Sequence, residues 1–198
     1  MPLLVETRSE LKAQLRKDAL ARREAMDVAQ RIEASMAIAD RAMGVWPAGE
    51  RSVLGGYLPI RSEVDPRPLM AMAADRRVQL AVPAIVGRAL DFRMLERDAP
   101  LEPQGHGTMA PGEAAPRLKP DILLVPLAAF DRRGHRIGYG GGFYDRAIAS
   151  LSEGGARPFT IGLAFAVQEI EAVPDEAFDM PLDLIVTEAE AIKADRFP

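Results

Sequence analysis

The sequence predicts a single α/β domain over residues 1–198, with a mostly parallel sheet flanked by helices in a Rossmann-like three-layer arrangement. Two observations lead to this fold class. Short apolar runs of strand length alternate with segments of helical periodicity along most of the chain. The 198 residues are 48% hydrophobic and 27% charged, which is ordinary for one soluble domain with a substantial core.

The first helix is expected to begin at Ser9, a residue type that caps helix N-termini, with Glu10 in the favourable first turn. Lys12 and Arg16 then fall on one face at a spacing of i, i+4. By itself a basic pair of this kind is typical of a solvated helix face, so the pattern alone assigns it no ligand.

The second helix is expected from Asp27, because Asp27 and Gln30 have the spacing of a capping box. Gly44 is a typical residue at the end of a helix. The apolar stripe that this helix would bury is Ile32, Met36, Ala39 and Met43.

The middle of the chain is expected to supply three strands and one helix. The strands are residues 53–58, residues 78–82 ended by Pro83, and residues 89–95 with Asp91 and Arg93 on a wet face. Pro66 suits the start of the helix, which would bury Leu69, Met70 and Ala73. From residue 100 to 120, eight of 21 residues are Gly or Pro, and no regular structure is expected. Such a loop is either a lid or a surface excursion, and composition does not decide between them.

The C-terminal half is expected to hold the central strand of the sheet at residues 122–125, which are all apolar. A helix at residues 143–151 and strands at residues 159–165 and 184–186 follow. Thr187 would cap a terminal helical turn.

Four glycines stand within five positions between the central strand and the helix at residue 143, namely Gly138, Gly140, Gly141 and Gly142. Bare backbone before a helix start is how an α/β protein presents amide groups to an anion. Arg136 and Arg146 flank this turn, and each can form forked bonds to phosphate. The simpler alternative is a glycine-rich hairpin followed by a helix, in which Asp145 pairs with Arg146.

Asp145 would repel a bare phosphate, and a divalent cation between the two resolves the conflict, because Mg²⁺ takes carboxylate and phosphate oxygens together. A second acidic run, residues 169–190, has eight acids and no Lys or Arg, and one of its carboxylates would complete such a site. Most acidic runs are instead solvated surface.

Several classes of protein are disfavoured. A net charge of −4 gives no support for nucleic-acid binding, and the absence of cysteine excludes disulfides and thiolate sites. The two histidines, His106 and His135, disfavour a polyhistidine metal site. No apolar run approaches the length of a membrane span, and no signal sequence is apparent, so the protein is expected in the cytoplasm. The glycines match neither a Walker A loop nor the Gly-x-Gly-x-x-Gly motif of dinucleotide sites.

The chain resembles the 5-formyltetrahydrofolate cyclo-ligase family, also called methenyltetrahydrofolate synthetases. The central signature is Phe130, Asp131, Gly134, Arg136, Gly138, Gly140, Gly142, Tyr144 and Asp145. Further matches, in the expected order, are Lys12 and Arg16, then Leu58 and Glu63, then Val173, Pro174 and Asp179. The resemblance therefore extends over nearly the whole chain.

The resemblance implies an enzyme that uses ATP and Mg²⁺ to cyclise 5-formyltetrahydrofolate to 5,10-methenyltetrahydrofolate through a phosphorylated formyl group. It implies ATP contacts from Lys12, Arg16, Arg136, Ile137, Gly138, Tyr139, Gly140, Gly141, Gly142, Phe143 and Tyr144. It implies folate contacts from Leu58, Glu63, Tyr139, Gly140, Gly141, Gly142 and Phe143, and Mg²⁺ ligation by Asp145 and Asp179. The expected partner is a small folate, with no nucleic acid or membrane, and the expected state is a monomer or weak dimer.

This chain departs from some relatives, which have an arginine at the position of Tyr139 and a lysine at that of Gly141. The glycine turn therefore carries less positive charge here. Two rival readings remain open: a non-catalytic folate- or nucleotide-binding module, and an enzyme similar to sugar-phosphate isomerases that needs no ATP.

Overall fold

The structure, a computed structural model, describes residues 7–47, 53–105, 107–153, 155, 157–176 and 179–194. His106 lies outside the described residues. In chain order the elements are α1 (Arg8–Glu24), α2 (Val28–Gly44), β1 (Val53–Gly55), α3 (Arg67–Asp75), β2 (Gln79–Val86), β3 (Ala89–Met94), β4 (Leu101–Gly105), β5 (Thr108–Pro111), β6 (Ile122–Pro126), β7 (Ala129–Phe130), β8 (Arg136–Ile137), α4 (Phe143–Ser152), β9 (Phe159–Leu163), η1 (Ala166–Gln168), β10 (Leu184–Val186) and β11 (Ala191–Lys193).

The main sheet has the strand order β11-β10-β9-β6-β1-β2-β3 among the described residues. The five inner strands, β10, β9, β6, β1 and β2, run parallel to one another. The outer strands β11 and β3 are antiparallel to β10 and β2. Strand β6 is the middle strand and is buried along most of its length, as its apolar sequence predicts. The predicted mostly parallel α/β sheet is confirmed.

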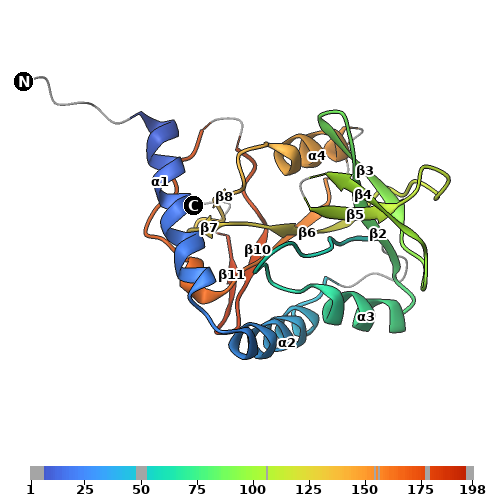
Figure 1. The fold of residues 1–198 in the computed structure, drawn as a ribbon, viewed down its shortest axis with the longest axis horizontal. Helices are drawn as coiled ribbons and strands as arrows, with labels where there is room; N and C mark the ends of the chain where they lie inside the picture. Colours follow the sequence, from blue (N-terminus) through green and yellow to red (C-terminus); the bar gives the residue numbers. More distant parts are fainter. Residues whose placement is uncertain are drawn as a thin grey trace, which may run out of the picture.

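Helices cover both faces of this sheet, with α2 and α3 on one face and α4 on the other (Figure 1). Ile38 of α2 and Leu69 of α3 share a core with Leu124 of β6. Ile148 of α4 belongs to a second core with Leu123, which directly precedes Leu124 in β6 and points to the opposite face. The three-layer arrangement is therefore confirmed.

Helix α1 lies beside the sheet rather than over it, next to β7 and η1 (Figure 1). Its Ala19 packs in a small separate cluster with Ala129, Ile137 and Val173. No helix among the described residues is long and apolar enough to cross a membrane.

The two N-terminal helices form where expected but differ in detail. The cap of α1 is Thr7 and not Ser9, because Thr7 and Glu10 make a reciprocal capping box. In α2 the capping box of Asp27 and Gln30 is confirmed. The predicted stripe of α2 is only half right: Ala39 and Met43 are buried, whereas Ile32 is 60% and Met36 49% exposed. The buried face is Ala34, Ser35, Ile38, Ala39, Ala42 and Met43, a mostly small-residue face that allows close approach to α3.

Strand β1 is shorter than predicted and β2 is longer, since β2 continues through Pro83 to Val86. Beyond Ala81, β2 pairs only with β3, so a residue without an N–H is tolerated there. Helix α3 buries Leu69, Met70 and Ala73 as predicted, although Pro66 is its N-cap rather than its first residue.

The segment 100–120 was expected to lack regular structure, but it contains the antiparallel hairpin of β4 and β5. Next to it, the predicted wet face of β3 is wrong for Arg93, which is buried. Arg93 donates to the Pro111 carbonyl at 2.8 Å and pairs with Asp91, so the hairpin covers a charged side chain whose bonds are satisfied.

The C-terminal turn also differs from the prediction. Thr187 does not cap a helical turn: its Oγ1 accepts from the N–H groups of Ala189 and Glu190 at 3.2 and 3.1 Å. These bonds close a tight turn that reverses the chain into β11.

Candidate active site

A cleft of about 800 Å³ opens at the carboxyl ends of the parallel strands. Strand β1 lies between β2, which follows it in the chain, and β6, which comes much later, so the strand order reverses beside β1. Ligands of open α/β sheets bind at such a reversal. The cleft is lined by Tyr57, Leu58, Pro59, Ile60, Arg61, Glu63, Pro83, Ile85, Leu90, Gly107, Thr108, Met109, Pro126, Arg136, Gly138, Tyr139, Gly141, Gly142, Phe143, Tyr144 and Asp145. Its volume is in the range of small-molecule sites.

The glycine turn forms one wall of this cleft. Gly142 is the N-cap of α4 with φ 62°, and Gly140 has φ 94°, conformations that side chains rarely adopt. A glycine N-cap carries no side chain over the first amides of α4, and these amides begin at the cleft wall. The predicted bare backbone at a helix start is therefore present.

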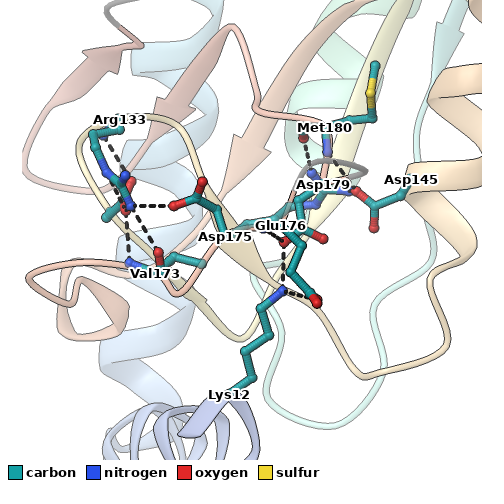
Figure 2. A network of polar contacts seen from close by, with 10 residues as sticks. Lys12, Arg133, Asp145, Val173, Asp175, Glu176, Asp179 and Met180 are labelled. Carbon is teal, nitrogen blue, oxygen red and sulfur yellow. Dashed lines mark hydrogen bonds and ion pairs between the residues drawn. The ribbon is translucent and has the colours of Figure 1, made fainter. Parts of the chain in front are cut away.

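Helix α1 brings two cations to this wall and its neighbourhood. Arg16 Nε donates to the Gly138 carbonyl at 2.7 Å, so its guanidinium lies against the glycine turn. Lys12 Nζ donates to Asp179 at 2.6 Å and to Glu176 at 3.1 Å (Figure 2). Burial lowers the pKa of Lys12, but the bonds to Asp179 and Glu176 outweigh it, and the net shift of the pKa is upward. The basic pair is therefore not a solvated face.

Asp145 pairs with Arg136, whose Nη2 donates to Asp145 Oδ1 at 2.7 Å. The same oxygen accepts from the Met180 N–H at 3.2 Å, which brings the segment of Asp179 to Asp145 (Figure 2). Burial lowers the pKa of Arg136 even beside this carboxylate. The alternative pairing of Asp145 with Arg146 is not seen: Arg146 donates to the Arg88 and Gly141 carbonyls instead.

Asp145 and Asp179 have the oxygen donors that Mg²⁺ prefers. Each already has a cationic partner, Arg136 for Asp145 and Lys12 for Asp179. In the part of the chain that the structure describes, no three His, Cys, Asp or Glu side chains gather closely enough to hold a metal. The donor chemistry fits the ion, and the present arrangement holds both carboxylates with protein cations.

The segment after β1 carries two further residues that the resemblance assigns to the folate. Leu58 and Glu63 lie on the segment after β1, and Glu63 Oε2 accepts from the Ile60 N–H at 2.9 Å. Burial raises the pKa of Glu63, and it also raises the pKa of Tyr139, whose side chain interacts directly with Glu63. The cleft thus joins a poorly hydrated carboxylate to aromatic walls.

Some residues assigned to ATP lie away from the cleft lining. Ile137 is buried in the small core with Ala19, so its side chain serves packing. Lys12 and Arg16 do not line the cleft either: Arg16 contacts the glycine turn at Gly138, and Lys12 pairs with Asp179, which is also absent from the lining. Tyr144, Phe143 and the other glycine-turn residues named above do line the cleft, apart from Gly140.

Two residues of this region received no role from the sequence. Arg23 reaches the Tyr139 hydroxyl from α1, and its position eleven residues after Lys12 on the same helical face was a usable signal. Asp131, buried, accepts from the N–H groups of Arg133, His135 and Val173. It joins the β7–β8 hairpin to the C-terminal segment, a tie that no local pattern reveals.

Known proteins share this architecture and sequence. The model of the 5-formyltetrahydrofolate cyclo-ligase family matches residues 8–188. The 5-formyltetrahydrofolate cyclo-ligase of Escherichia coli K12 is 31% identical over 177 residues, covering 84% of this chain and 94% of that protein. The 5,10-methenyltetrahydrofolate synthetase of Aquifex aeolicus superposes with a TM-score of 0.79 at 28% identity, over 95% of both chains. The synthetase of Mycoplasma pneumoniae has the same fold, with a TM-score of 0.70 at 20% identity. The chain belongs to the 5-formyltetrahydrofolate cyclo-ligase family of enzymes.

Proposed function

We propose that this enzyme uses ATP and Mg²⁺ to cyclise 5-formyltetrahydrofolate to 5,10-methenyltetrahydrofolate, releasing ADP and phosphate. The observation that carries the proposal is the meeting of three distant segments around the glycine turn that borders the cleft. Helix α1 supplies Lys12 and Arg16, the glycine turn supplies bare backbone, and the carboxylates come from Asp145 and Asp179. This combination suits a polyphosphate with a divalent cation next to an aromatic-walled pocket.

In the proposed reaction the formyl oxygen attacks the γ-phosphorus of ATP, and ADP leaves. The neighbouring folate nitrogen then attacks the formyl carbon and loses its proton, and the oxygen departs as phosphate. An amide oxygen is a poor leaving group, and phosphorylation makes it a good one. The tasks of the protein are therefore to position the two substrates and to neutralise charge.

Arg136, Ile137, Gly138, Tyr139, Gly140, Gly141, Gly142, Phe143 and Tyr144 would surround the nucleotide together with Lys12 and Arg16. Arg16 already lies against the turn through the Gly138 carbonyl, where a phosphate would find both its charge and the first amides of α4. The glycine turn would also border the folate.

Asp145 and Asp179 would hold Mg²⁺, which neutralises phosphate charge when bound. To do so they must release Arg136 and Lys12, whose cationic groups are then available to phosphate. This exchange of partners predicts that the metal binds weakly to the free enzyme and tightly with the nucleotide.

On the segment after β1, Leu58 would contact the pterin ring, and Glu63 would accept hydrogen bonds from the N–H groups of that ring. A carboxylate that is already poorly hydrated has little water to lose when the ring enters. The side chains of Tyr139 and Phe143 line the same cleft and offer apolar contact. We further propose that the protein is cytoplasmic and is a monomer or weak dimer. Sedimentation of the purified chain would test the oligomeric state.

The direct test is Asp145→Asn, which keeps the size of the side chain and removes its charge. We expect kcat for methenyl product, followed by its near-ultraviolet absorbance, to fall about 100-fold or more. Mn²⁺ binding in the presence of ADP, measured by electron paramagnetic resonance, should weaken in parallel. Asp175→Asn is the matched control, because among the described residues Asp175 forms its ion pair with the half-exposed Arg133, and this variant should keep normal turnover. An Asp145→Asn enzyme with full turnover at saturating Mg²⁺ would remove this residue from the metal site.

A further inference from the structure

Arg23 carries a buried charge near the end of α1. Its side chain is only 1% exposed. Its Nε donates to Ser62 Oγ at 3.0 Å, and its Nη1 donates to the Tyr139 hydroxyl at 2.9 Å. The remaining nitrogen, Nη2, is buried and has no hydrogen-bond partner among the described residues. The guanidinium carbon lies 5.9 Å from the centre of the Tyr139 ring, so the arginine backs the ring.

Burying a guanidinium without a carboxylate partner is unfavourable for stability. Within the described part of the chain, no carboxylate forms an ion pair with Arg23. The segment it contacts already has another bond to α1, because Ser62 Oγ donates to Glu24 at 2.6 Å. The contact between α1 and Ser62 therefore does not require the charge of Arg23, because Glu24 also bonds Ser62. The hydrogen bond to the Tyr139 hydroxyl is the contact that Arg23 adds.

Arg23 acts on two side chains that line the part of the cleft proposed to hold the folate, namely Tyr139 and Glu63. We call this part the folate wall. Tyr139 lines the cleft with part of its ring exposed, and Glu63 lines the cleft on the segment that follows Ser62. The charge of Arg23 lowers the pKa of Glu63 against the larger effect of burial. Arg23 itself is absent from the cleft lining, so it acts on a ligand only through its neighbours.

We propose that Arg23 is a positioning residue for the folate ring, fixing the Tyr139 ring through its hydroxyl so that the ring and Glu63 together form the recognition wall. The inference rests on the proposed function, because it takes folate as the ligand of that wall. Arg23 determines the affinity for the folate rather than the chemistry at the phosphate, since Arg16 and Arg136 occupy the nucleotide side.

The test uses three variants: Arg23→Met, Tyr139→Phe and the double variant that combines these two changes. Arg22→Met is the matched control. Arg22 is the adjacent exposed arginine, which bonds only backbone carbonyls of Val167 and Glu169. We expect Arg23→Met and Tyr139→Phe each to raise KM for 5-formyltetrahydrofolate about tenfold. For Arg23→Met, which lies outside the cleft lining, kcat and KM for ATP should stay within about twofold of wild type. The double variant should be no worse than the worse single variant, because both remove the same contact. Arg22→Met should leave both KM values unchanged.

A second measurement separates positioning from a structural role. Equilibrium dialysis of 5-formyltetrahydrofolate without ATP should show the same tenfold weakening for Arg23→Met. Ser62→Ala should bind the folate normally, because it removes the bonds of Ser62 to Arg23 and Glu24 and leaves the bond between Arg23 and Tyr139. If Arg23→Met does not fold, Arg23→Lys and Tyr139→Phe carry the comparison, and Arg23→Lys should fold but bind folate weakly, since an ammonium lacks the fork. Unchanged folate affinity in these variants, or additive effects in the double variant, would overturn the inference. A wild-type enzyme that makes no methenyl product would instead refute the proposed function.

Discussion

At the scale of single residues, ionised Glu63 is expected to lower the stability of the fold and to strengthen binding of the folate. Because burial raises its pKa in the folded state, Glu63 contributes stability that is present at pH values below its unfolded pKa and is lost as pH rises through its folded pKa. Glu63→Gln should therefore be more stable than wild type at pH 8, and the difference should shrink towards pH 5. Urea denaturation at both pH values measures it. The same variant should raise KM for the folate at least about tenfold, as expected for a charged acceptor of ring N–H groups. A difference in stability that is independent of pH would contradict the titration.

Asp131 is the buried carboxylate that joins the β7–β8 hairpin to the C-terminal segment. Its buried carboxylate accepts three backbone N–H groups and the Arg133 guanidinium. Asp131→Ala leaves those donors without a partner, and we expect it to lower the free energy of unfolding by about 3 kcal/mol. Arg133→Ala is the matched comparison: the three N–H bonds survive and the side chain is half exposed, so the loss should be much smaller. Equal losses in urea denaturation would assign the stability to the ion pair.

At the scale of elements, α1 is the helix to which the proposed function gives the clearest role, the binding of ATP through Lys12 and Arg16. It stands outside the three layers, and Lys12 reaches across 167 positions of sequence to Asp179 (Figure 2). Lys12→Ala combined with Arg16→Ala should raise KM for ATP about tenfold or more, because two charges that we propose to contact the phosphates are lost. KM for the folate should change less. Lys17→Ala, on the exposed side of α1, serves as the control. A larger effect on folate than on ATP would sink this division of roles.

The elements that the sequence predicted well are those decided by local chemistry. The capping box of α2, the apolar strand β6 and the glycine start of α4 each depend on a few neighbouring residues. The errors lie where distant partners decide. Pro83 stays in β2 because the strand has lost its β1 neighbour there, and Arg93 is buried because the β4–β5 hairpin covers it. No local pattern reports either partner.

At the scale of the whole molecule, the candidate site is assembled from both ends of the chain around a reversal in strand order. Residue types in the glycine turn indicated an anion site, but the partners of Asp145 and Asp179 were not predictable, since they depend on how α1 and the last strands pack. The structure places Lys12 and Arg136 on these carboxylates, and this is why ATP and Mg²⁺ are expected to bind together rather than separately.

The most direct test of the central claim is the absorbance of the methenyl product with wild-type enzyme and 5-formyltetrahydrofolate under four conditions: neither ATP nor Mg²⁺, each alone, and both. We predict product only when both are present, with one ADP released for each methenyl group formed. Product formation without ATP, or ATP hydrolysis that leaves the folate unchanged, would contradict the account.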